Sequence, residues 1–227
     1  MGEIMMREFD LVLFDLDGTL IATAPEICDA VNDTLRNFNL TEVTEKQVND
    51  WIGYGTRELL IQSLAATTRT SVSAVRSGPD IKMISAEFDT HYQNRCGTRS
   101  HLYPQVTATL LALRGLGVKL AVVTNKEARH SAKVLLAHNL HSLFDVVISG
   151  DTLVTKKPDP AGVISCLAQF GVTKNRALFV GDSSIDVATA RNAGVRVFAL
   201  PYGYNMGRQV QDSHPDRVMA NISELLN

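Results

Sequence analysis

The feature that most constrains the fold is a repeated alternation of short apolar segments with longer amphipathic ones. Segments this short and continuously apolar are typical of strands buried on both faces of a parallel sheet. Five such segments occur in the 227-residue chain, at 9–14, 118–123, 146–149, 177–180 and 195–200.

The segments between these predicted strands have helical patterns. We expect helices at 105–114, 126–139, 160–170 and 183–193, three of which stop at or next to Gly115, Gly171 and Gly194. Strands that alternate with helices at this spacing form right-handed βαβ units. The sequence therefore predicts an α/β fold, with a doubly wound (Rossmann-like) parallel sheet.

One long stretch interrupts the alternation. Residues 21–98 contain no good strand pattern, and we expect helices at 26–38, 45–51, 56–64 and 81–92, with a loop at 71–79. We therefore predict a core made of residues 1–20 and 99–227, and a helical subdomain, 21–98, inserted directly after the first strand.

Composition narrows the functional classes. Lys plus Arg number 22 and Asp plus Glu 24, giving a formal charge of −2, so no basic excess indicates nucleic-acid or membrane binding. The N-terminal residues carry acids and lack a signal-peptide pattern, and no window is apolar enough for a membrane span. Cys28, Cys96 and Cys166 lie far apart without metal-binding spacing. We expect a cytoplasmic protein with reduced thiols.

Two acids follow the first predicted strand. Asp15 and Asp17 are two residues apart, which places both on one face, and Gly18 permits a sharp turn. Ligands bind at the carboxyl ends of strands in such sheets. Two close carboxylates raise each other's pKa unless a cation lies between them, so the pair favours a metal site. A turn with two solvated acids is the alternative.

Three later strand ends carry polar groups of complementary chemistry. Thr124 and Asn125 can hydrogen-bond phosphate oxygens, although both also suit a helix cap. Lys157 stands between a second lysine and Pro158, just before a helix, where a cation can meet a phosphate. Asp182 and Asp186 lie four apart on one helix face. Each signal has a structural alternative, but the four occur in order at successive strand ends.

This ordered set resembles the haloacid dehalogenase (HAD) superfamily over nearly the whole chain. The matching motifs are Asp15-Leu-Asp-Gly-Thr-Leu20, Thr124, Lys157 before Pro158, and Gly181-Asp182-Ser183 with Asp186. A helical insertion after the first motif corresponds to that family's type 1 cap.

The resemblance implies a role for each matching residue. Asp15 would attack phosphorus and form an aspartyl-phosphate, and Asp17 would protonate the leaving group and later activate water. Thr124 would hydrogen-bond the phosphoryl group, and Lys157 would neutralise its charge.

The resemblance also implies a metal site. Asp15, the backbone carbonyl of Asp17, and Asp182 would hold Mg²⁺, the cofactor expected of such oxygen ligands. Asn125, Ser183 and Asp186 would support the site.

A finer resemblance concerns the substrate. Ala24-Pro25-Glu26, Trp51-Ile-Gly-Tyr-Gly55, Thr124-Asn-Lys126 and Pro201-Tyr-Gly-Tyr-Asn205 look like the phosphoglycolate phosphatases of this superfamily. Ala22-Thr23 replaces the usual Asp-Ser, and Ala161-Gly-Val163 departs from the usual lysine motif. Arg57, Tyr54 and Lys126 are the candidate specificity residues.

We therefore expect a phosphatase of a small phosphorylated metabolite, 2-phosphoglycolate first, acting as a monomer or homodimer. A pyrophosphatase, a nucleotidase, a sugar-phosphate phosphatase and a phosphosugar mutase remain alternatives within the superfamily. A non-catalytic phosphate-binding regulator is disfavoured because the acid set is complete.

Overall fold

The computed structural model describes residues 8–226 and confirms the predicted α/β class. Its main sheet has six parallel strands in the order β5-β4-β1-β6-β7-β8. The strands are β1 (Leu11–Phe14), β4 (Lys119–Val123), β5 (Val146–Ile148), β6 (Ala177–Gly181), β7 (Arg196–Ala199) and β8 (Arg217–Val218). The five predicted strands are all present, whereas the two-residue edge strand β8 was not predicted.

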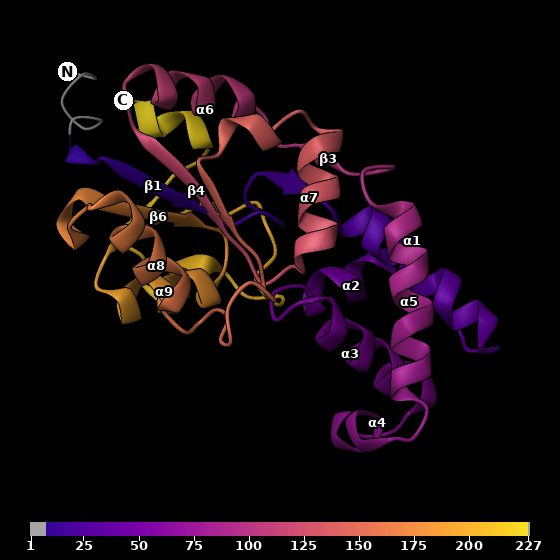
Figure 1. Cartoon of the computed structure of the whole chain (residues 1–227). Helices are drawn as coiled ribbons and strands as arrows, with labels where there is room; N and C mark the ends of the chain where they lie inside the picture. The colour runs from indigo at the N-terminus through magenta and orange to yellow at the C-terminus, as the bar shows by residue number, and fades with distance from the viewer. Residues whose placement is uncertain (1–7, 227) are drawn as a thin grey trace.

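Helices cover both faces of this sheet. Figure 1 shows α6 and α7 on one side and α8 and α9 on the other. Their bounds are α6 (Val106–Gly115), α7 (Ala128–Ala137), α8 (Ala161–Phe170) and α9 (Ser184–Ala193). Short 3₁₀ helices occur at η2 (His141–Leu143), η3 (Lys174–Arg176), η4 (Val210–Ser213) and η5 (Ile222–Leu226).

Successive side chains of β1 point to opposite faces of the sheet and pack in two separate layers of the core. Val12 and Phe14 belong to the apolar cluster that includes Leu110 of α6, whereas Leu11 and Leu13 pack in the cluster with α8 and α9. Because successive strand residues point to opposite faces, a fully buried strand must be apolar at every position. β1 meets this requirement and lies between β4 and β6 in the interior of the sheet.

The chain leaves this layered core after β1 and forms a group of helices beyond the sheet (Figure 1). These helices are α1 (Ala24–Asn37), α2 (Glu45–Trp51), α3 (Thr56–Thr68), α4 (Val72–Ser77) and α5 (Ile81–Arg95). Helix α2 starts at Thr44, whose side chain accepts from the backbone N–H of Gln47 in a capping box. Apolar residues of this group, among them Phe88 and Tyr92, continue the core.

Two expectations about this stretch were wrong. Residues 72–77 form α4 instead of a loop, because the Ser71 hydroxyl accepts from the backbone N–H of Ala74 and starts the helix. The stretch is also not free of strands: β2 (Ile21–Ala22) pairs antiparallel with β3 (His101–Leu102). A two-residue strand stabilised by a partner 80 positions away leaves no periodic pattern to detect.

The three cysteines are free thiols buried in the fold, as their scattered spacing predicted. Burial raises the pKa of Cys166 to about 12, which opposes thiolate chemistry there. Within residues 8–226, no helix combines the length and the apolar character needed to cross a bilayer.

Candidate active site

The site lies where three neighbouring parallel strands end. β1 runs into Asp15, β4 into Thr124 and β6 into Asp182. The register pairs Phe14 with both Val122 and Val180, so the three strand ends are level with one another. The sheet therefore brings together residues that are up to 167 positions apart in sequence.

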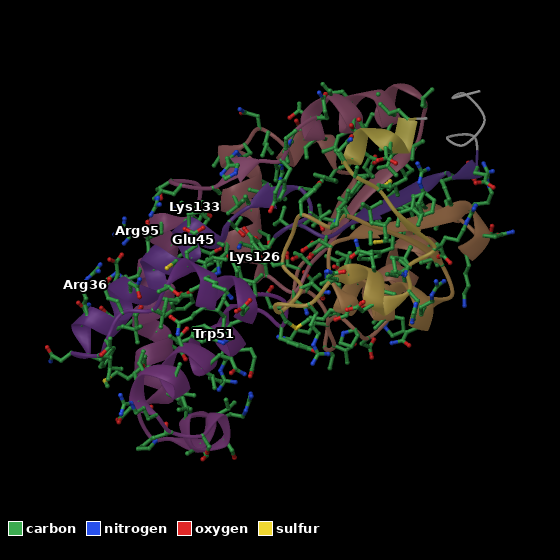
Figure 2. The ribbon with its side chains drawn as sticks, turned by 180° about the vertical axis from the view of Figure 1, so that it is seen from behind. Arg36, Glu45, Trp51, Arg95, Lys126 and Lys133 are labelled. Atoms are coloured by element: carbon green, nitrogen blue, oxygen red, sulfur yellow. The ribbon has the colours of Figure 1, made fainter. Side chains whose placement is uncertain are left out.

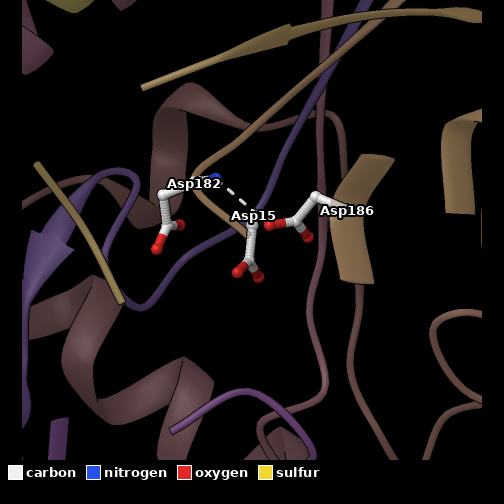
Figure 3. Close-up of side chains that lie close together, drawn as sticks. All are labelled: Asp15, Asp182 and Asp186. Carbon is white, nitrogen blue, oxygen red and sulfur yellow. Dashed lines mark hydrogen bonds between the residues drawn. The ribbon is translucent and has the colours of Figure 1, made fainter. Parts of the chain in front are cut away.

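Three buried carboxylates form the centre of the site. Asp15, Asp182 and Asp186 each place an oxygen within 4.8 Å of the others, and Figure 3 shows Asp15 between the two later acids. The Lys157 ammonium lies 2.7 Å from Asp15 Oδ1 and 2.7 Å from Asp186 Oδ1. One cation thus pairs with two of the three acids in this cluster.

Asp186 has both oxygens engaged by protein donors. Its Oδ2 accepts hydrogen bonds from the Asp182 and Ser183 backbone N–H groups at 3.1 and 3.0 Å and from the Ser183 hydroxyl at 2.7 Å, while Oδ1 accepts from Lys157. Ser183 is the N-cap of α9 and completes a capping box with Asp186. Asp186 therefore acts as a structural anchor for Lys157.

Asp182 is held by donors from two other loops. The Thr19 hydroxyl donates to Oδ1, and the Tyr204 backbone N–H donates to Oδ2 at 2.6 Å. Burial, followed by the charges of Asp186 and Asp15, raises the pKa of Asp182 well above its ordinary value. Thr19 follows the predicted acid pair directly, but its partner was not predicted because the two residues meet only in the fold.

The electrostatics of the cluster favour a divalent cation. Burial raises the pKa of Asp15 to about 6, even though Lys157 opposes the shift. Burial alone would lower the pKa of Lys157, but Asp15 and Asp186 raise it above its usual value. Buried acids that outnumber the nearby cations are stabilised by a metal, and carboxylate oxygens are ligands that suit Mg²⁺. The residues present therefore fit a magnesium site.

Asp17 sits in a separate hydrogen-bond network beside the cluster. The Lys126 ammonium donates to Asp17 Oδ1 and Oδ2 at 2.9 and 3.1 Å, and the Thr23 hydroxyl donates to Oδ1 at 2.7 Å. Lys126 also hydrogen-bonds the Tyr92 hydroxyl of α5. Sequence reasoning missed Thr23 and Tyr92, and for Tyr92 no local motif existed that would have found it.

A small space of about 30 Å³, partly open to solvent, lies between the strand ends and the inserted helices. Its lining residues are Asp15, Asp17, Ile27, Ile52, Gly53, Gly55, Thr56, Leu59, Thr124, Asn125 and Lys126. Residues of the core and of the inserted helices therefore line this space together.

The predicted supporting residues take different positions. Asn125 is buried and donates through Nδ2 to the carbonyls of Gly53 and Lys157, which joins the inserted loop to the lysine loop. Lys126 lines the small space, whereas Tyr54 is 46% exposed and Arg57 is exposed, and neither lines it. The structure thus brings together one of the three candidate specificity residues with the acids.

Comparisons with known proteins identify the family of this chain. The family model described as "Haloacid dehalogenase-like hydrolase" matches residues 12–200. Two curated relatives, both called "Phosphoglycolate phosphatase", come from Haemophilus influenzae (38% identity, 98% of this chain and 99% of the relative) and Aliivibrio fischeri (39%, 98% and 97%).

Solved structures of similar proteins share the fold of this chain. A predicted phosphoglycolate phosphatase from Haemophilus somnus superposes with a TM-score of 0.89 at 33% identity, covering 96% of this chain and 97% of its own. CbbY from Rhodobacter sphaeroides, solved in complex with phosphate, has a TM-score of 0.79 at 22% identity over 96% of both chains, which supports the fold alone.

Proposed function

Because the chain belongs to the haloacid dehalogenase-like hydrolase family, we propose that it is a magnesium-dependent phosphatase that hydrolyses 2-phosphoglycolate to glycolate and phosphate. The observation that carries the chemistry is the buried Asp15 carboxylate, which faces Lys157 at 2.7 Å and is followed two residues later by Asp17. The names of the curated relatives support the substrate.

In the first step, a carboxylate oxygen of Asp15 attacks phosphorus. The bond between phosphorus and the ester oxygen breaks, and the leaving glycolate oxygen takes a proton from Asp17. The Lys157 ammonium and the Thr124 hydroxyl stabilise the negative charge on the phosphoryl oxygens. The product of this step is an aspartyl-phosphate on Asp15.

In the second step, water attacks the phosphorus of that intermediate. Asp17, now a carboxylate, accepts a proton from the water, and the bond between phosphorus and Asp15 breaks. Inorganic phosphate leaves, Asp15 returns as a carboxylate, and Asp17 is again protonated. The cycle therefore consumes one water and leaves the protein unchanged.

Asp15, Asp182 and the backbone carbonyl of Asp17 would hold Mg²⁺. Bound there, the ion supplies neutralisation of charge on the transferring phosphoryl group. Asp186 holds Lys157 and the Ser183 backbone in place instead of binding the metal, because both of its oxygens already accept hydrogen bonds.

We further propose that residues 21–98 act as a cap over a core of residues 1–20 and 99–227. Helices of this segment line the small space beside Asp15, so we expect cap movement to accompany substrate entry. A compact two-carbon ester fits such a site better than a nucleotide or a sugar phosphate. We place the protein in the cytoplasm, as a monomer or homodimer acting on a small metabolite without nucleic-acid or membrane partners.

The nucleophile is tested with Asp15→Asn. The amide is a poor nucleophile, so magnesium-dependent phosphate release should fall at least about 10³-fold, the scale of losing an essential catalytic group. Asp10→Asn is the matched control, since Asp10 is an exposed residue paired with Arg176 at the start of β1. Turnover retained in Asp15→Asn protein that unfolds at the wild-type temperature would rule out Asp15 as nucleophile.

The substrate is tested with a panel of phosphorylated compounds compared by kcat/KM. We expect 2-phosphoglycolate to rank first, ahead of pyrophosphate, nucleoside monophosphates and hexose phosphates. A higher kcat/KM for one of those three classes would assign the enzyme to that class. Transfer of the phosphate to a second sugar hydroxyl, instead of to water, would indicate a mutase.

A further inference from the structure

Lys126 is an ammonium group buried between the sheet and the inserted helices. Its side chain is 0% exposed, and Figure 2 places it between the core and the helical group. Burial alone would lower the pKa of Lys126, but the charge of Asp17 raises it, so the group is cationic. Its hydrogen-bonding partners are Asp17 and the Tyr92 hydroxyl. A buried charge of this kind is costly unless it is paired.

Lys126 lines the same space as Asp15 and Asp17, the two acids of the proposed reaction. Among the described residues that line the small space, Lys126 is the only one with a positive side chain. The lining also includes Ile27, Ile52 and Leu59, whose side chains offer no polar group to a substrate. Lys126 is therefore the counter-charge that this lining offers to an anionic group on the leaving part of a substrate.

The distances select for a short substrate. Lys126 Nζ lies 2.9 and 3.1 Å from the oxygens of Asp17, the residue that has to reach the ester oxygen, so a short turn of the Asp17 side chain leaves the ammonium about 6 Å from that oxygen. In 2-phosphoglycolate a single methylene separates the ester oxygen from the carboxylate. That carboxylate falls within reach of Lys126.

We propose that Lys126 is a specificity-determining residue that binds the substrate carboxylate in exchange for the carboxylate of Asp17. The exchange replaces one carboxylate partner by another, so the buried ammonium stays paired throughout. Asp17 is released from a contact that engages both of its oxygens, takes up a proton from solvent and turns toward the ester oxygen as the acid of the first step. This inference rests on the proposed function, because it requires that the substrate is a phosphomonoester with a nearby carboxylate.

The cap takes part in this recognition through Tyr92. Its hydroxyl hydrogen-bonds the Lys126 ammonium. Tyr92 belongs to α5, so the cation is fully surrounded only when the cap is closed. Recognition of the carboxylate is thus coupled to cap closure.

The test compares two esters that differ at one group, 2-phosphoglycolate and 2-hydroxyethyl phosphate, which carries a neutral hydroxymethyl in place of the carboxylate. Lys126→Met removes the charge, and Lys126→Gln removes the charge while keeping an N–H donor for Asp17. Lys133→Met is the matched control, because Lys133 donates to the Gln93 carbonyl of α5 from the surface of α7. Figure 2 labels both lysines.

In both Lys126 variants, kcat/KM for 2-phosphoglycolate should fall about 10- to 100-fold more than for the neutral ester, as expected for one hydrogen bond to a charged group. The larger part of that difference should appear in KM. In Lys133→Met, kcat/KM for each ester should stay within about twofold of the wild-type value. An unchanged ratio between the two esters in Lys126→Met and Lys126→Gln would overturn the inference, because Lys126 would then act through Asp17 alone.

A binding measurement separates this inference from the proposed function. Wild-type protein that releases no phosphate from either ester would contradict the phosphatase assignment. Calorimetric titration of 2-phosphoglycolate into Asp15→Asn and into Asp15→Asn with Lys126→Gln then decides the role of Lys126. A Kd at least tenfold weaker in the double variant supports carboxylate binding, and equal Kd values overturn it.

Discussion

At the scale of single residues, two glycines make room for the Asp182 carboxylate. A Cβ at Gly18 would lie 2.3 Å from Asp182 Oδ2, and one at Gly203 would lie 2.2 Å from the same oxygen. Gly18 also has a φ of +90°, which favours glycine. The glycine in the first motif therefore does more than allow a turn, since its missing side chain lets Asp182 approach Asp15.

This crowding predicts the effect of Gly203→Ala. The added methyl must displace Asp182, so we expect Mg²⁺ to bind at least about tenfold more weakly, with a stability loss of about 1–3 kcal/mol from overpacking. Titration calorimetry with Mg²⁺ and urea unfolding measure the two effects. Gly115→Ala is the control, because that site has no neighbour within 4 Å of the new Cβ and lies in α6. Equal Mg²⁺ affinity in Gly203→Ala and wild type would contradict the steric argument.

At the scale of elements, the start of α7 forms a polar contact with the inserted helices. Glu127 Oε2 accepts from the Thr56 hydroxyl of α3 at 2.7 Å and lies 3.5 Å from His130 Nδ1. His130 is buried, and its Nε2 lies 3.1 Å from Asp89 of α5. Burial would raise the pKa of Glu127, but the nearby His130 ring and the hydrogen bond from Thr56 lower it to about 2.

The lowered pKa gives this contact a pH dependence. A carboxyl group whose folded pKa lies below its unfolded value of 4.5 stabilises the protein above that value, and the stabilisation is lost as pH falls toward 2. Glu127→Gln should therefore lower the free energy of unfolding by about 2 kcal/mol at pH 7, and the difference from wild type should shrink between pH 5 and pH 3.

Urea unfolding at pH 3, 5 and 7 measures this difference. Glu42→Gln is the matched control, because Glu42 pairs with Arg36 on the surface and such pairs contribute about 0–1 kcal/mol. A gap between wild type and Glu127→Gln that stays constant with pH would show that the hydrogen bonds to the charged form contribute nothing.

At the scale of the whole molecule, the buried side chain of Glu26 connects the two segments through which the chain leaves the core and returns to it. The chain leaves the core through β2 and returns through β3, and these two strands pair. Glu26, fully buried in α1, accepts hydrogen bonds through Oε2 from the backbone N–H groups of Gly97 and Ser100 at 2.8 and 3.0 Å. Helix α1 thereby holds the returning segment beside the outgoing one.

Glu26→Ala should loosen this connection. Loss of the acceptor leaves buried N–H groups unpaired, so the free energy of unfolding should fall by about 2–3 kcal/mol and the Gly97 and Ser100 amides should exchange faster. Asp29→Ala is the control on the same helix, because Asp29 binds the exposed Arg99 side chain and should cost less than about 1 kcal/mol. Exchange rates unchanged in Glu26→Ala would contradict this role for Glu26.

The sequence by itself determined the layered core and the inventory of reactive groups. Continuous apolar segments predicted the five longer strands, because a strand buried on both faces admits few polar residues. Polar residues at the ends of those strands identified Asp15, Thr124, Lys157 and Asp182, because parallel strands present their carboxyl ends along one edge.

Only the tertiary structure decided how these groups are paired. The contacts of Lys126 with Tyr92, of Thr19 with Asp182 and of Glu26 with Gly97 join residues with no shared periodicity, so no local pattern records them. The two-residue strands β2, β3 and β8 were invisible for the same reason, since each depends on its partner. Local sequence specifies which groups are available, whereas long-range packing sets the charge balance around each one.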